Sequence, residues 1–208
     1  MNGIDNYETL VKTLGKMHDI YADCATMYNK TMQNLVEKAN ENWKSKELQD
    51  FLIKVKEASD KTGKSIENSF IVLTESMEAD ARSYAESNNT GMDSINQIQH
   101  IEPVTYDLNI EGTKIDGSAM NIEAINSAMN VIQQSKETMV DTITPIKSLP
   151  TGYIGDPDIK IKDAIQKIIA NVIGMFDFFD QLLQELRHGT EKFENLNSQT
   201  NSTFDINP

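Results

Sequence analysis

Residues 42–51, NWKSKELQDF, contain the only tryptophan of the chain, Trp43, and separate two long segments with helical hydrophobic periodicity. Asn42 and Ser45 both have side chains suited to capping the start of a helix. Glu47 would fall in the first turn of that helix, where the helix dipole favours an acidic side chain. The stretch therefore predicts a reversal between two helices, the second of which begins close to Ser45.

The two segments that flank this reversal are both amphipathic. The first, from Tyr7 to Ala39, has apolar residues at heptad spacing, which predicts a helix about 50 Å long at ~1.5 Å per residue. Its stripe consists of Tyr7, Leu10, Val11, Leu14, Met17, Tyr21, Cys24, Ala25, Tyr28, Met32, Leu35 and Ala39. The stripe of the second consists of Leu48, Phe51, Leu52, Val55, Thr62, Ile66, Phe70, Leu73, Met77, Ala81 and Tyr84. Residues 1–88 are therefore expected to form an antiparallel helical hairpin, which needs a second hairpin to cover its open groove.

Residues 118–197 repeat this layout around a weaker turn, residues 152–161 (GYIGDPDIKI), 110 positions after the first turn. The helix before this turn is predicted to end ahead of Pro145, because proline has no backbone N–H. A single last helix is expected to run to about residue 197. The sequence thus predicts an all-α fold in which two long antiparallel hairpins form a four-helix bundle. The chain would be a monomeric pseudo-dimer, or a homodimer if the hairpins are exchanged between two chains.

Two segments lack this periodicity. In the linker, residues 89–117, apolar residues alternate with polar ones at Val104, Tyr106, Leu108 and Ile110, ahead of a possible turn at residues 111–112. This pattern fits a short β-hairpin and fits equally well an irregular linker held by a few apolar side chains. The tail, residues 198–208, is expected to be mobile.

The composition sets limits on partners and location. The chain has 38% hydrophobic and 25% charged residues, as soluble globular proteins do, and its net charge is −13. That charge repels phosphate backbones, so no nucleic acid partner is expected. The amino terminus, MNGIDNYETL, has neither the basic region nor the apolar region of a signal peptide. A chain that leaves the cell would therefore be exported without a cleaved leader.

No group of residues has the spacing of a catalytic or cofactor site, so we expect no enzyme activity, no cofactor and no metal. His188 follows Glu185 by three, the spacing with which some helical bundles bind paired metals, but a second such pair is missing. A solvated or locally bonded His188 is the expectation. Cys24 lies in the apolar stripe of the first helix and is expected to be a buried, inert thiol.

Trp43 has two interpretations. It is either an aromatic residue that closes the end of the first hairpin, or part of a recognition motif. The order of long helix, turn tryptophan, long helix and tyrosine near its end resembles the WXG family of small helical hairpins exported by type VII (ESX) secretion systems. That family has Trp-x-Gly at the turn and Tyr-x-x-x-Asp/Glu near the end of the second helix. The resemblance places its turn tryptophan at Trp43 and the tyrosine of its export motif at Tyr84.

The sequence departs from the family pattern in each half. Ser45 replaces the turn glycine, and Asn88 replaces the acidic residue. The second half keeps the glycine but replaces the two aromatic residues. The spacings still agree, at 41 in the first half (43 to 84) and 40 in the second (153 to 193), so the resemblance covers nearly the whole chain as two imperfect copies. The export or interaction residues it indicates are Trp43, Tyr84, Asn88, Tyr153, Gly155 and Phe193.

The resemblance implies a non-enzymatic protein, made in the bacterial cytoplasm and exported to the outside or the cell surface. Family members pair so that the turn of one hairpin lies beside the tail of its partner, and the two together form a signal for the secretion ATPase. The implied partners are that ATPase and its membrane machinery, and also a toxin or a WXG-type protein if the chain serves as a targeting factor.

Between residues 165 and 186 the last helix is apolar around much of its girth. This segment is predicted either to lie at the centre of the assembly or to contact a separate protein. The residues of such a partner surface would be Ile169, Ile173, Phe176, Phe179 and Leu183. Two alternative functions remain at this point: a membrane-acting helical toxin that inserts this segment into lipid, and a structural coiled-coil protein.

Overall fold

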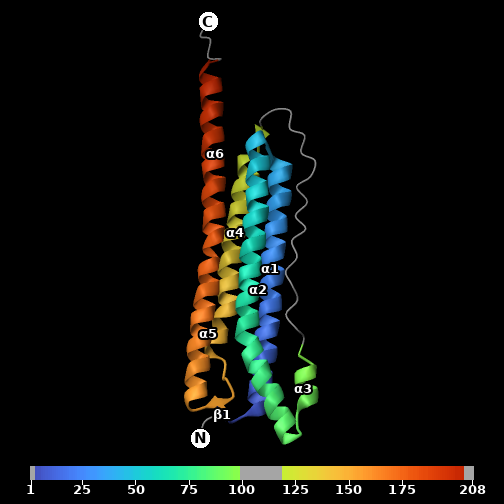
Figure 1. Cartoon of the computed structure of the whole chain (residues 1–208). Helices are drawn as coiled ribbons and strands as arrows, with labels where there is room; N and C mark the ends of the chain where they lie inside the picture. The colour runs from blue at the N-terminus through green and yellow to red at the C-terminus, as the bar shows by residue number, and fades with distance from the viewer. Residues whose placement is uncertain (1–2, 99–118, 204–208) are drawn as a thin grey trace.

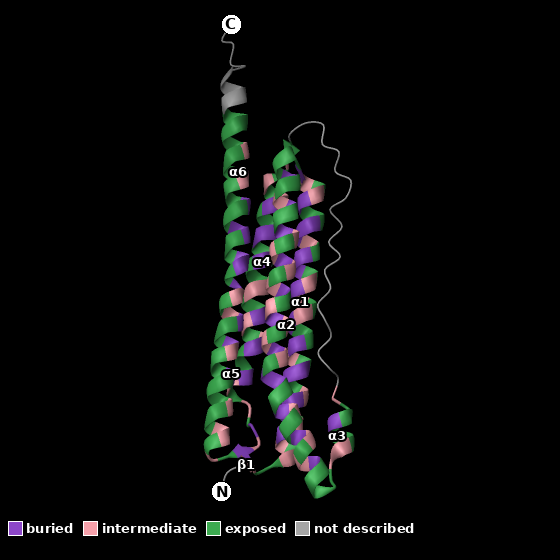
Figure 2. Cartoon of the chain, in the orientation of Figure 1, coloured by how far each residue is buried: buried purple, intermediate pink, exposed green. Residues whose placement is uncertain are grey.

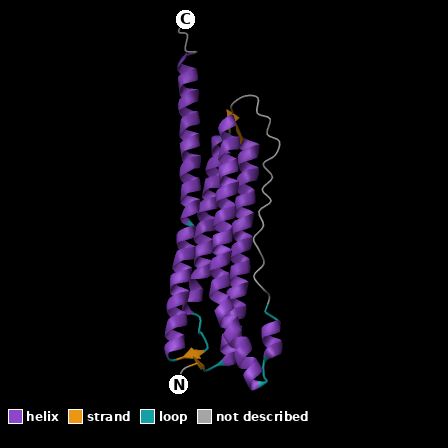
Figure 3. Ribbon diagram, viewed as in Figure 1, coloured by secondary structure: helices purple, strands orange, loops and turns teal. Residues whose placement is uncertain are grey.

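The computed structural model describes residues 3–98 and 119–203, and most of them are helical (Figure 3). The predicted all-α class is confirmed, since the strands within the described residues are two residues long each. The β-hairpin considered for the linker and the last five residues of the tail lie outside the described residues.

The first half follows the predicted boundaries closely. Helix α1 (Tyr7–Asn42) leads to strand β2 (Trp43–Lys44) and then to helix α2 (Lys46–Asn88). Ser45, one of the two predicted caps, accepts a hydrogen bond from the Leu48 backbone N–H (3.3 Å) through its hydroxyl group. A short helix that the sequence did not indicate, α3 (Met92–Asn96), then packs against α2.

The second half contains one more break than the sequence predicted. Helix α4 (Ile122–Ile143) ends ahead of Pro145 as expected and continues as a 3-10 turn, η1 (Thr144–Ser148), to strand β4 (Tyr153–Ile154). The expected single last helix is instead two helices, α5 (Asp156–Met175) and α6 (Asp177–Thr203), and α6 continues past residue 197.

The break between α5 and α6 is a tightened turn. The Phe176 N–H donates to the Ile173 carbonyl and the Phe179 N–H donates to the Phe176 carbonyl, so both bonds span three residues instead of four. With this change of pitch, Phe176, Phe178 and Phe179 are all buried. In a regular helix, which turns by ~100° per residue, residues 176 and 179 would share one face and residue 178 would lie farther around the helix. The break thus coincides with a cluster of buried aromatic rings, in which Phe179 contacts Phe176, Phe178 and Tyr28 of α1.

The long helices run side by side (Figure 1). Helix α1 packs against α2 and α4, α5 packs against α2, and α6 packs against α4. Buried residues occur along the length of the packed helices, and the upper part of α6, which is mostly exposed, extends beyond the other helices (Figure 2). The largest fully buried side chains are Tyr28, Phe70, Phe176, Phe179, Leu10, Leu14, Met17, Met32, Leu48, Leu52 and Met77.

Two small antiparallel sheets link the halves of the chain. Strand β1 (Gly3–Ile4) pairs with β4, and β2 pairs with β3 (Ala119–Met120). In each case the turn of one half pairs with the segment that precedes the first helix of the other half. The backbone N–H of Asn6 donates to the Gly152 carbonyl (3.0 Å), and that of Asn121 donates to the Asn42 carbonyl (2.7 Å). The two ends of the molecule therefore use the same connection.

Candidate interaction sites at the two turns

Trp43 is held at one end of the molecule by residues from both halves. Strand β2 positions it, and its indole ring is largely buried, with its centre 5.8 Å from that of Phe51. The ring also lies over Gly189 of α6, where an added Cβ would be only 3.1 Å from Cη2 of the indole. Gly189 thus permits a close approach that a side chain would hinder. The first turn is thereby in contact with the last helix of the other half.

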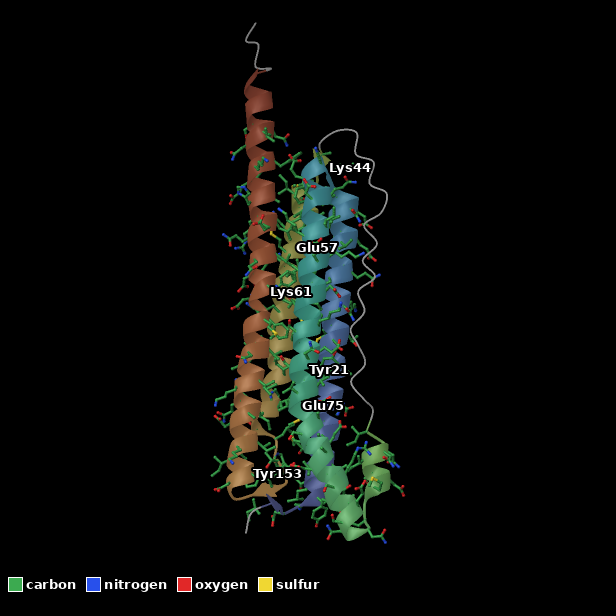
Figure 4. All side chains as sticks on the ribbon, viewed as in Figure 1. Tyr21, Lys44, Glu57, Lys61, Glu75 and Tyr153 are labelled. Atoms are coloured by element: carbon green, nitrogen blue, oxygen red, sulfur yellow. The ribbon has the colours of Figure 1, made fainter. Side chains whose placement is uncertain are left out.

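Tyr153 occupies the equivalent place at the opposite end, where it is labelled in Figure 4. It is buried, and its hydroxyl group donates a hydrogen bond to Oδ2 of Asp80 in α2 (2.9 Å). Burial, followed by this bond to Asp80 and the charge of its carboxylate, raises the pKa of Tyr153 well above its ordinary value. The second turn is thereby tied to the second helix of the first half.

Tyr84 and Asn88 follow Asp80, the hydrogen-bond partner of Tyr153, by four and eight residues on α2. The ring of Tyr84 stacks on Tyr7, with centres 5.3 Å apart and planes 15° apart. The exposed Asn88 side chain donates to the Tyr84 carbonyl (2.8 Å). Trp43 precedes α2 and Tyr84 falls in its last turns, so the two residues that best match the family motif are at opposite ends of one helix.

Gly155 and Phe193 have distinct positions. Gly155 precedes α5 with φ +75° and ψ −147°, a backbone conformation that residues with a side chain rarely adopt. Phe193 is half-buried on α6 and lines the same groove as Trp43. Each turn aromatic therefore faces the helix that carries the tail residue of the other half: Trp43 faces the helix of Phe193, and Tyr153 faces the helix of Tyr84.

A groove with a volume of about 610 Å³ opens between the first half of α2 and α6. Its apolar lining includes Trp43, Phe51, Val55, Phe178, Leu182, Phe193 and Leu196, and its polar lining includes Glu47, Asp50, Lys54, Glu185, His188 and Lys192. The sequence analysis did not find this groove. A second row of α6 residues spaced by three and four lines the groove. In the sequence this row is difficult to distinguish from the apolar stripe of the same helix.

The residues predicted to form a partner surface on the last helix pack inside the chain instead. Ile169, Phe176, Phe179 and Leu183 are buried within the chain, and Ile173 is half-buried. Of the two predictions made for this segment, the structure therefore supports a position at the centre of the molecule. These five residues do not form an exposed apolar patch.

The side chains of Cys24 and His18 also lie in the core. Cys24 is buried as predicted, and burial raises the pKa of its thiol to about 12, so the thiolate is strongly disfavoured at neutral pH. His18 is also buried, and its Nε2 lies 2.7 Å from Oε1 of Glu78. This pair joins α1 to α2.

Within residues 3–98 and 119–203, no cluster of three His, Cys, Asp or Glu side chains has the arrangement of a metal site. Glu185 and His188 both line the groove, but in the described residues they do not form a metal-binding group with a third ligand. Among the helices of the same part of the chain, none is sufficiently long and apolar to cross a membrane. Comparison with models of protein families finds no match, and comparisons with curated proteins and with solved structures find none either.

Proposed function

We propose that this chain consists of two WXG-like hairpins joined in one molecule and that it acts in a type VII secretion system. It would be a substrate or a targeting partner, without enzyme activity, and it would act through helical protein–protein contacts. The proposal rests on one observation, that the turn of each half contacts the other half. Trp43 of the first turn lies over Gly189 in the second half, and Tyr153 of the second turn donates a hydrogen bond to Asp80 in the first.

The contacts between the halves support a four-helix bundle in which one chain acts as a pseudo-dimer. Helix α1 packs against α4 of the other half as well as against α2 of its own. Both small sheets also pair one half with the other. Two separate hairpins of the WXG family would meet in the same way, with each turn beside the tail of its partner.

The two ends of this pseudo-dimer would not be equivalent as signals. One end combines Trp43 with the Phe193 region of α6, and the other combines Tyr153 with the Tyr84 region of α2. Each end thus has one aromatic residue of the family motif and a substitute for the other. Recognition by the secretion ATPase would use the Trp43 end, and the chain would leave the cytoplasm folded. A toxin or a WXG-type protein would be a second partner.

The test is the export of the variant Trp43→Ala by the native host. Phe70→Ala is the matched control, because it also removes a buried aromatic side chain at a cost of about 3–5 kcal/mol but lies in the middle of α2. Circular dichroism shows whether each variant remains helical. We expect a folded Trp43→Ala protein to stay in the cells while Phe70→Ala is exported. Wild-type export of Trp43→Ala would overturn the proposal.

A further inference from the structure

We propose that the groove between α2 and α6 is a docking site for one amphipathic helix of a separate protein, with basic residues on both sides of its apolar face. This inference names the class of partner for the protein–protein contacts described above and therefore rests on the proposed function. Three features of the groove support it: the shape of its walls, the absence of a cover from residues 3–98 and 119–198, and its charge.

Both walls of the groove are helices that present rows of residues spaced by three and four. On α2 the row runs from Glu47 to Ala58, and on α6 it runs from Phe178 to Leu196. At ~1.5 Å per residue the α6 row is about 27 Å long, which is the length of a helix of about 18 residues. Side chains at these spacings form the holes into which the side chains of a third helix fit. The shape thus suits a helix better than a compact ligand.

The equivalent place at the other end of the molecule is closed by the chain itself. There α5 packs against α2, and the bond between Tyr153 and Asp80 bridges the two elements. At the Trp43 end the indole of Trp43 covers Gly189, but α6 packs mainly against α4. Phe51 and Phe193 remain half-buried, and Leu196 is 51% exposed. Among the residues that the structure describes, this apolar surface lacks the cover that its counterpart has.

Charge favours a basic partner over a second copy of this chain. Three acidic side chains line the groove, Glu47, Asp50 and Glu185, compared with two lysines, Lys54 and Lys192. The whole chain carries a net charge of −13, so two copies repel each other. A helix with Lys or Arg beside its apolar face would instead be attracted to the molecule and would pair with the acidic side chains at the rim.

The proposal is tested with three synthetic peptides of about 18 residues that contain no tryptophan. One has a leucine stripe at helical spacing with lysine flanks, one has the same stripe with glutamate flanks, and one is a scrambled form of the first. Trp43 is the only tryptophan and lines the groove, so its fluorescence reports binding to the full-length protein. We expect a saturable change in emission with the lysine peptide, binding at least about tenfold weaker with the glutamate peptide, and none with the scrambled peptide.

Two pairs of variants locate the binding site. Leu196→Gln should weaken binding of the lysine peptide, whereas Val72→Gln, which changes a similarly exposed apolar residue outside the groove, should not. The double variant Glu47→Gln/Asp50→Asn should weaken it about fivefold, whereas Asp19→Asn/Asp23→Asn, which removes two exposed acids from α1, should leave it nearly unchanged. Circular dichroism of each variant checks its fold.

Several outcomes would overturn the inference. These are equal binding of the lysine and scrambled peptides, no binding at all, or equal loss in the groove and control variants. A concentration-dependent dimer that Leu196→Gln disrupts would show that a second copy occupies the groove and would also overturn it. Failure here leaves the proposed function standing, provided that Trp43→Ala still blocks export. Normal export of Trp43→Ala together with specific peptide binding would remove the proposed function and retain the docking site.

Discussion

Gly152 lies where the second turn touches the beginning of α1. Its φ is +79°, and a Cβ at this position would lie 2.6 Å from the Asn6 carbonyl oxygen and 2.7 Å from the Leu10 backbone nitrogen. Both obstacles belong to the backbone, so neither can move aside as a flexible side chain would. The carbonyl of Gly152 also accepts the N–H groups of Asp5 and Asn6. A single residue thus controls how one end of the molecule is closed.

We therefore predict that Gly152→Ala lowers the free energy of unfolding by more than about 2 kcal/mol, through the unfavourable φ and the steric overlap. Gly15→Ala is the control, since it lies inside α1 with nothing within 4 Å of the added Cβ. That change should raise stability by about 0.5–1 kcal/mol, because alanine favours the helix. Urea unfolding followed by circular dichroism measures both. Equal effects of the two substitutions would contradict the assigned role of Gly152.

Tyr153 should make the free energy of unfolding depend on pH in the alkaline range. Its pKa in the folded state is raised by burial and by the bond to Asp80, whereas the unfolded value is about 10. Below pH 10 the tyrosine is protonated in both states, and its contribution is fully present. As the pH rises above about 10, the unfolded state loses the proton first, so the free energy of unfolding falls. Tyr21 and Cys24, whose pKa values burial also raises, should add to this decline.

The expected result is a stability that falls above pH 10 and a shallower fall in Tyr153→Phe, by up to about 1.4 kcal/mol per pH unit. The phenylalanine keeps the ring and removes only the titrating hydroxyl group. Urea unfolding from pH 8 to pH 11 measures the slope for each protein. An unchanged slope in Tyr153→Phe would mean that this residue does not contribute to the alkaline sensitivity.

At the scale of elements, helix starts and stops that depend on local capping and on proline were predicted from the sequence. Ser45 caps α2, and α4 ends ahead of Pro145, because a hydroxyl side chain and a missing N–H act within one turn of the backbone. The break at Phe176 could not be found in this way. The rings around it contact residues that are distant in sequence, such as Tyr28 against Phe179, and no local pattern records those contacts.

The small sheets and the groove escaped prediction for the same reason. Gly3–Ile4 and Ala119–Met120 are too short to show an alternating pattern, and each pairs with a segment more than 70 positions away. The groove depends on how far α2 and α6 are separated, which no local pattern records. The residues singled out at the turns, Trp43 and Tyr153, were nevertheless those that contact the opposite half.

Two helix caps at equivalent places offer a test at this scale. Oδ1 of Asn6 accepts from the Thr9 N–H (2.9 Å), and Oδ1 of Asn121 accepts from the Ala124 N–H (3.1 Å). We predict that Asn6→Ala and Asn121→Ala each lower the free energy of unfolding by about 1 kcal/mol, as the loss of an N-cap does. Asn6→Asp and Asn121→Asp retain the acceptor and should cost little. Thermal unfolding measures all four, and a large effect at only one of the two sites would argue against their equivalence.

At the scale of the whole molecule, each half completes the other. Helix α1 packs against α4, α5 packs against α2, and each end is closed by a strand from one half paired with a strand from the other. A hairpin produced alone would expose the apolar stripes that these contacts cover, and helices of this kind depend on tertiary packing for most of their stability. The covalent link between the halves should therefore be less important than the contacts between them.

We predict that residues 1–98 and residues 119–208, produced as two chains, assemble into a one-to-one complex with the helix content and Trp43 fluorescence of the intact protein. Each chain alone should have a lower helix content per residue, and residues 1–98 alone should show Trp43 emission shifted to longer wavelength, because Gly189 and the rest of α6 no longer cover the indole. Circular dichroism, fluorescence and light scattering of the separate and mixed chains measure these quantities. If residues 1–98 alone matched the intact protein in both spectra, the first hairpin would be an independent domain, and its contacts with the second would not be needed for folding.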